Sequence, residues 1–326
     1  MKNRVVVVLL VALMVTNGLV LGTFPAFAST FPTKEIKVIV PWSPGGATDV
    51  MVRALQPIFK SKFGANLVVL NKPGGSSAVG LTEMIAAKPD GYTIGIASSS
   101  ILSLMALNEV PWRTDKFTNI ALISEDPLIL IVKADGRFKS LDDFMKAVVE
   151  NPGKITVGTP GSRNVNHCMS LLAAEAAGAE IRHVPFGGAS DALAALLGGH
   201  IDSVVAKPND AMGQLKSGDA KAIGVFMDER SPALPDVPSF KEAGYDVFKY
   251  GKMAQVSFMV APAGVPEDVQ EKLASMFYEV IKSDEFQELA RNNGFIAEPI
   301  IGDELDAYIA ELYGSLENIA KKAFAE

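Results

Sequence analysis

The sequence predicts an α/β protein in two halves, each built on a largely parallel sheet with helices on both faces. Strand patterns alternate with helical patterns, beginning with β-branched runs at residues 36–40, 67–70 and 92–97, as expected for βαβ units. A buried strand pattern at 128–132 starts a second series of the same kind. Another apolar run, at 256–260, is followed by helical patterns alone. The chain is therefore expected to leave the first half near the fourth run and to return at the fifth.

The strand patterns of the first half end in polar loops that lead into helices. The first strand runs into the sequence PWSPGG, after which Thr48 or Asp49 is expected to cap a helix. The second strand leads into NKPGGSS and a helix with apolar residues at helical spacing from Leu81. The third runs into three consecutive serines, Ser98 to Ser100.

The second half repeats this alternation. Ser140 is expected to cap a helix whose first turn carries Asp142 and Asp143. Two further helices are predicted, one over about 165–177 and one that stops at Gly198. The remaining strands of this half are predicted at residues 154–158, 182–184, 202–206 and 221–226. After the return, helices are predicted at 267–282, 284–292 and 303–322.

These patterns define the expected domains. The first domain is predicted to hold residues 29–127 and 257–326, and the second to hold residues 128–256, with a ligand cleft between them. The chain crosses between the domains twice. Two crossings make a two-segment hinge, which allows the domains to close around a ligand.

The N-terminus has the features of a secretory signal peptide. Lys2 and Arg4 precede an unbroken apolar run at 5–15, and residues 26–28 (AFA) fit a signal-peptidase site. Cleavage is expected before Ser29, which would deliver the protein to the periplasm. The alternative is a membrane anchor, but the apolar run is short of the roughly 20 residues that a spanning helix needs. No cysteine lies near the cleavage site to carry a lipid.

The composition argues against nucleic acid as a partner. The full chain has a formal net charge of −7, and without the leader 28 basic residues face 37 acidic ones. An anionic ligand would therefore have to be attracted by local donors. Cys168 is the sole cysteine of the sequence, so no internal disulfide forms. Cys168 follows His167 directly, and adjacent helical residues diverge too far to act as nucleophile and base, so a buried role is expected.

Four loops are rich in glycine, serine or asparagine and follow predicted strands. They are residues 43–48, 71–77, 159–166 and 186–190. Glycine allows backbone N–H groups to approach a ligand, and helix N-termini add unpaired donors with a partial positive charge. One such loop is explained by a tight turn alone. Four at corresponding strand ends favour an anion-binding cleft. Neither a phosphate-binding P-loop nor a dinucleotide fingerprint is present in the sequence, so no cofactor is expected.

Seven segments resemble, in order, those of the tripartite tricarboxylate transporter receptors, the Bug or TctC-like extracytoplasmic solute-binding proteins. The segments are residues 31–49, 71–75, 88–93, 183–188, 196–202, 230–238 and 261–266. The resemblance spans essentially the whole chain after the leader. It implies a two-domain periplasmic-binding-protein (type II, Venus flytrap) fold, a small organic carboxylate ligand such as a di- or tricarboxylate, and delivery to a separate two-component membrane permease. Such receptors are usually monomers.

The resemblance also implies where the ligand is held. The first contact loop starts at Ser43, with backbone donors at Gly45, Gly46 and Ala47. Asp49 carries the wrong charge for an anion, and is interpreted as holding this loop or positioning water. In the second domain Ser162 and His167 match the serine and histidine of the family loop.

This chain departs from the family pattern between those two residues, where Arg163, Asn164 and Asn166 intervene. Arg163 either holds a second carboxylate through a bidentate contact or points to solvent or a nearby acid. His167 either donates to the ligand or caps its loop. The remaining candidate contacts are Asn164, Ser76, Ser98, Ser99, Trp42 and Lys207.

Two other functions use the same cleft. A sensory receptor would present its bound ligand to a membrane kinase. A periplasmic hydrolase has less support, because the sequence holds no G-x-S-x-G elbow, no H-E-x-x-H and no cysteine and histidine spacing typical of a metal site. A binding receptor without enzymatic activity is the leading hypothesis.

Overall fold

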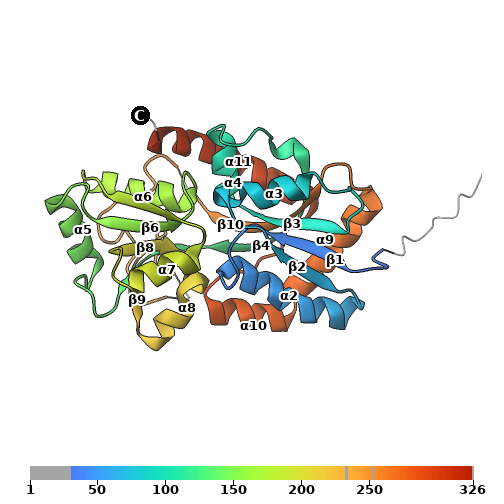
Figure 1. Cartoon of the computed structure of the whole chain (residues 1–326), viewed down its shortest axis with the longest axis horizontal. Coiled ribbons are helices and arrows are strands. Elements are labelled where there is room, and N and C mark those ends of the chain that lie inside the picture. Colours follow the sequence, from blue (N-terminus) through green and yellow to red (C-terminus); the bar gives the residue numbers. More distant parts are fainter. Residues whose placement is uncertain (1–30, 232–233, 252, 325–326) are drawn as a thin grey trace, which may run out of the picture. The chain divides into compact units, whose positions relative to one another are not determined.

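A computed structural model describes residues 31–231, 234–251 and 253–324, and the predicted leader lies outside these residues. Residues 31–326 group into one compact unit. This unit contains two five-stranded sheets with helices on both faces of each (Figure 1). The α/β fold in two halves is thereby confirmed.

The first sheet has the strand order β2-β1-β3-β10-β4. β1 (Ile36–Val40) pairs in parallel with β2 (Leu67–Asn71) and with β3 (Thr93–Ser98). β10 (Gln255–Pro262) is antiparallel to its two neighbours, β3 and β4 (Phe117–Asp126). The carboxyl ends of the three parallel strands therefore meet at one edge, where ligands bind in folds of this kind.

Helices cover both faces of the first sheet (Figure 1). One face packs against α2 (Ala47–Phe63), α9 (Glu267–Ile281) and α10 (Asp284–Asn293), with a core that includes Leu55 and Phe277. The other face packs against the remaining three helices of this half. These are α3 (Ala78–Ile85), α4 (Ser99–Ala106) and α11 (Gly302–Ala323). Two short 3₁₀ turns, Gly75–Ser77 and Thr114–Lys116, precede α3 and β4.

The second sheet has the strand order β7-β6-β8-β5-β9. Its strands are β5 (Leu128–Lys133), β6 (Thr156–Pro160), β7 (Arg182–Phe186), β8 (Ser203–Ala206) and β9 (Ala220–Phe226). β6 is parallel to β7 and β8, whereas β5 is antiparallel to β8 and β9. α5 (Leu141–Glu150) and α6 (Val165–Ala176) pack on one face, and α7 (Ala189–Leu197) and α8 (Pro208–Ser217) on the other.

Two segments join the sheets, one at Pro127 between β4 and β5, and one between β9 and β10. The apolar core also continues across the junction, because α11 packs against both α4 and α6. The strands therefore divide near the expected crossings, although the residues form a single compact unit. The exact domain boundaries stay a prediction.

The helix caps were predicted in part. Ser140 caps α5, and its hydroxyl accepts from the N–H of Asp143 at 3.1 Å. The prediction that Thr48 or Asp49 caps α2 was wrong, because the helix begins at Ala47 with Gly46 as its N-cap. Gly46 is extended (φ −75°, ψ 166°), as an N-cap residue should be. The patterns also missed β4, α4 and α8.

Candidate functional site

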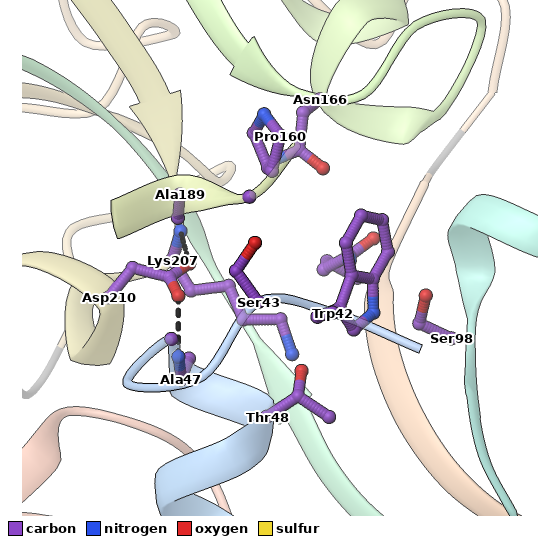
Figure 2. A pocket seen from close by; sticks show the side chains of 13 residues that line it. Trp42, Ser43, Ala47, Thr48, Ser98, Pro160, Asn166, Ala189, Lys207 and Asp210 are labelled. Carbon is purple, nitrogen blue, oxygen red and sulfur yellow. Dashed lines mark hydrogen bonds between the residues drawn. The ribbon is translucent and has the colours of Figure 1, made fainter. Parts of the chain in front are cut away.

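A small cavity lies where the loops of the two sheets face each other (Figure 2). It measures about 30 Å³, which is enough for roughly one or two water molecules. The residues that line it are Trp42, Ser43, Gly46, Ala47, Thr48, Ser98, Pro160, Asn166, Gly188, Ala189, Lys207, Asp210 and Gln255. Both sheets contribute, so the cavity depends on the two halves lying close together.

Five helices begin at this cavity. Its lining includes first-turn or cap residues of α2, α4, α6, α7 and α8. Each helix N-terminus carries the equivalent of about half a positive charge and unpaired N–H groups. A helix N-terminus that is left uncapped favours an anion even in an acidic chain.

Two side chains of the cavity wall have no hydrogen-bond partner. Ser98 Oγ and Gln255 Oε1 are buried without one, and their residues are 3% and 6% exposed. Because buried polar atoms are rarely left unpaired, these two atoms of the cavity wall are available to a ligand or an ordered water. The sequence indicated Ser98, but it missed Gln255 because the strand pattern was recognised one residue later.

Asp49 holds the loop between β1 and α2. Its carboxylate accepts from the Gly45 N–H at 2.9 Å, from Asn71 Nδ2 at 2.9 Å and from Arg53 Nε at 2.9 Å. Burial alone would raise the pKa of Asp49, but the hydrogen bonds from Arg53, Gly45 and Asn71 hold the pKa below its usual value. These contacts are those of a residue that positions the loop.

The backbone donors of this loop already have partners within the chain. Gly45 N–H donates to Asp49, and Gly46 N–H donates weakly to the Ser43 carbonyl at 3.4 Å. Ala47 N–H donates to Asp210 Oδ1 at 2.7 Å, across the two halves of the protein (Figure 2). The N-terminus of α2 is therefore capped by a carboxylate from α8.

No local motif in the sequence marks Asp210, so it was not among the predicted site residues. Burial raises the pKa of Asp210, while the N–H groups of Ala47 and Lys207 and the charge on Lys207 oppose that rise. Asp210 Oδ2 accepts from the Lys207 N–H at 3.2 Å and so forms part of a capping box at the start of α8.

Lys207 uses its charge within the protein. Its amine forms an ion pair with Asp126 at the end of β4 and donates to Ser257 Oγ at 2.7 Å on β10. Ser124 Oγ donates to the same Asp126 carboxylate at 3.1 Å. The predicted ligand contact of Lys207 is therefore limited to the part of the residue that lines the cavity, because its amine is already paired.

The second predicted loop packs on the first half beside this cavity. Ser162 N–H donates to Ser76 Oγ at 2.9 Å, and Ser76 Oγ donates to the Ser162 carbonyl at 2.8 Å. Gly161 allows this approach, because a Cβ there would collide with Ser76 Oγ. Neither Ser76 nor Ser162 lines the small cavity.

Arg163 and Asn164 also have structural partners. The Arg163 guanidinium pairs with Glu109 of the first half, and both residues line a separate open hollow of about 470 Å³. Asn164 caps α6, since its Oδ1 accepts from the His167 N–H at 3.0 Å. Of the two roles left open for Arg163, the structure shows pairing with an acid.

His167 faces His183 rather than the cavity. The two rings stack with centroids 3.4 Å apart and planes 10° from parallel. His167 Nδ1 accepts from the Arg163 N–H at 3.2 Å, and Thr159 Oγ1 lies 2.7 Å from His183 Nε2. Burial lowers the pKa of His167 to about 3, helped by the charges of His183 and Arg163, and burial lowers the pKa of His183 to about 4. Both rings are therefore neutral near pH 7.

The remaining predicted residues lie as follows. Ser43, Gly46, Ala47, Ser98 and Lys207 line the small cavity, whereas Gly45, Asp49, Asn164 and His167 are not among its lining residues. Ser99 Oγ is engaged with β10, where it accepts from Val256 N–H at 2.9 Å and donates to the Ala254 carbonyl at 2.6 Å. Cys168 is buried, and burial raises the pKa of its thiol to about 12.

The family profile described as Tripartite tricarboxylate transporter family receptor (TctC) matches residues 51–321. The chain belongs to this family. A UPF0065 protein of Bordetella pertussis is 30% identical over 86% of both chains. The structure of the periplasmic binding protein BugD is 27% identical with a TM-score of 0.84, covering 91% of this chain and 99% of its own.

A third similar protein is MatC from Rhodopseudomonas palustris, solved with bound malate. It is 26% identical with a TM-score of 0.79, and the match covers 89% of this chain and 100% of that one. The expected periplasmic-binding-protein fold and the membership of the TctC family are thus confirmed, and the receptor is a solute-binding protein of the TctC type.

Among the residues that the structure describes, none of the helices is long and apolar enough to cross a membrane. The same residues also hold no group of three or more histidine, cysteine, aspartate or glutamate side chains placed to bind a metal ion.

Removing the buried amine of Lys207 should destabilise this TctC receptor strongly. Lys207→Met leaves Asp126 buried without a counter-charge, and the expected loss is about 3–5 kcal/mol in the free energy of unfolding. Adding Asp126→Leu should recover most of that loss. Lys146→Met, which breaks an exposed pair with Glu150, is the control and should change little. Denaturant titration measures all four proteins, and equal losses for Lys207→Met and Lys146→Met would contradict the buried-pair interpretation.

The stacked histidines should make the receptor labile in acid. Because the pKa of His167 is near 3 in the folded protein and about 6.5 in an unfolded chain, the unfolded state binds more protons between these values. Stability therefore falls as the pH falls below about 6.5, by up to about 1.4 kcal/mol per pH unit for each such proton. His167→Phe should flatten the dependence of Tm on pH between 6.5 and 4, while His200→Gln at an exposed position should leave it unchanged. An unaltered slope in His167→Phe would refute this assignment.

Proposed function

We propose that this receptor captures a small organic carboxylate in the cavity between its two sheets, in the periplasm, and delivers it to a two-component membrane permease of the tripartite tricarboxylate type. The observation that carries the proposal is the buried N-terminus of α4. Its N-cap residue, Ser98, makes no side-chain cap, and the Ser98 hydroxyl lies unpaired in the cavity wall. We expect the protein to act as a monomer and without enzymatic activity.

The other N-termini at the cavity are less open to an anion. α2, α7 and α8 each carry an acidic residue in the first turn, namely Asp49, Asp191 and Asp210. α6 is capped by Asn164. α4 has neither a side-chain cap nor a first-turn acid. The ligand carboxylate is therefore placed at α4, rather than on the Gly45–Ala47 donors, whose N–H groups have partners.

The electric field at the N-terminus of α4 favours a carboxylate, in spite of the net charge of −7 on the chain. α4 is buried along its whole length, so its dipole is screened less than that of a surface helix. The Ser98 hydroxyl and the Gln255 amide supply further hydrogen-bonding groups for the ligand. The similarity to the malate-bound MatC protein supports a ligand of this class and size.

The ligand enters only when the two sheets move apart. A cavity of about 30 Å³ holds water but no dicarboxylate. The two connecting segments at Pro127 and before β10 supply the hinge for such a motion. The contacts between Ser76 and Ser162 and between Arg163 and Glu109 close the halves again.

A thermal-shift screen with mono-, di- and tricarboxylates tests the proposal. A carboxylate at 100 times its Kd should raise the stability by about 2.7 kcal/mol. Ser98→Ala should weaken the bound carboxylate by about 1.5–3 kcal/mol, the usual range for a hydrogen bond to a charged group. Ser217→Ala, at the far end of α8, is the matched control and should bind as the wild type does. If no carboxylate raises Tm, the receptor does not bind this class of ligand.

A further inference from the structure

Asp210 is a buried carboxylate in the wall of the cavity that the function proposed above does not use. It lines the cavity opposite Ser98, beside the start of α2 (Figure 2). Both of its oxygens accept backbone N–H groups, Oδ1 from Ala47 at 2.7 Å and Oδ2 from Lys207 at 3.2 Å. An oxygen that accepts a backbone donor keeps further lone pairs for a second donor.

No basic side chain forms an ion pair with Asp210, although the charge on Lys207 acts on its carboxylate. Lys207 is the nearest basic residue in sequence, but its amine pairs with Asp126 and donates to Ser257. Among the ion pairs of residues 31–231, 234–251 and 253–324, none includes Asp210. A buried carboxylate of this kind is stabilised by a positive or hydrogen-bond-donating group, and the space next to it is the ligand cavity.

The two sides of the cavity therefore differ in the groups that they present to a ligand. The side at α4 presents an uncapped helix N-terminus and the unpaired Ser98 hydroxyl. The side at α2 presents Asp210, so a second ligand carboxylate there would meet a like charge at close range. A ligand with acceptors at both ends cannot satisfy both sides, whereas one with an acceptor and a donor can.

We infer that Asp210 is a specificity-determining residue, which selects a small carboxylate that also carries a hydrogen-bond donor, an ammonium or hydroxyl group, directed at α2. The inference rests on the proposed binding of a carboxylate at α4. The ammonium is the stronger partner, because its charge offsets that of Asp210 in a site from which water is largely excluded. Gln255 adds an acceptor to the lining of the cavity, because its Oε1 is buried without a partner.

Matched ligands test the inference on the wild-type protein. Succinate, malate and aspartate share a four-carbon dicarboxylate chain and differ in carrying a hydrogen, a hydroxyl or an ammonium on one carbon. Propionate, lactate and alanine repeat the comparison on a shorter chain. In whichever series binds, we expect the Kd measured by calorimetry to fall from the unsubstituted compound to the hydroxyl and then to the ammonium compound. The ammonium compound should bind at least tenfold more tightly than the unsubstituted one. Equal or tighter binding of the unsubstituted compounds would overturn the inference and leave the proposed carboxylate receptor in place.

Asp210→Asn keeps the shape of the side chain and removes its charge. This variant should lose most of the preference for the ammonium compound, mainly through weaker binding of that compound. Asp219→Asn removes the same charge from an exposed position after α8 and should keep the wild-type preference. If Asp210→Asn instead tightens all compounds by the same factor, Asp210 is a competitor for ligand carboxylates and selects nothing. If none of the compounds binds and no other carboxylate raises Tm, the proposed function fails, and the inference fails with it.

Discussion

Lys207 connects the two halves of this receptor by a buried charge contact. Its backbone belongs to the start of α8 in the second half, while its amine reaches Asp126 and Ser257 on the two strands of the first sheet that lie next to the crossings. Because a buried charge is tolerated only with a partner, Lys207 is held toward the junction and kept away from the ligand. This leaves Asp210, three residues further on, at the cavity wall with two backbone N–H partners and no ion pair of its own. The two sides of the cavity differ in charge because the Lys207 amine forms its ion pair with Asp126 and not with Asp210.

The fold was largely predictable, because its strands are short, apolar and rich in β-branched residues. The strand at Ile36–Val40 was predicted with its observed bounds, and most others within about two residues. The missed elements lack these signals. β4 mixes polar residues into its sequence and lies antiparallel beside β10, so its pairing comes from tertiary contacts. α4 opens with two serines, which have weak helix propensity, and is stabilised by complete burial. α8 begins with a proline at its first position, a helix start that the patterns did not use.

The sequence predicted which loops form the site, but it predicted fewer of the contacts within the site. Glycine-rich segments correctly marked Ser43, Gly46 and Ala47 as cavity residues, since the conformation of a loop is a local property. The sequence did not indicate Asp210 or Gln255, because their role depends on residues far away in the chain. The contact between Ala47 and Asp210, for example, joins residues 163 positions apart. Motif matching placed Ser162, Arg163 and His167 at the ligand. In the structure these residues contact Ser76, Glu109 and His183, and their contact with a ligand stays a prediction.

The caps of the helices at the cavity limit where an anion can bind. Five N-termini at one cavity would attract almost any anion if all were open. Here own-chain groups satisfy α2, α6 and α8, and Asp191 occupies the first turn of α7. One open terminus remains, at α4, and it defines the position of the proposed carboxylate, while the capping groups face the rest of that ligand. A side chain that caps a helix across the cavity, as Asp210 does, occupies one anion position and presents an acceptor in its place, which is the physical basis of the specificity that we infer for it.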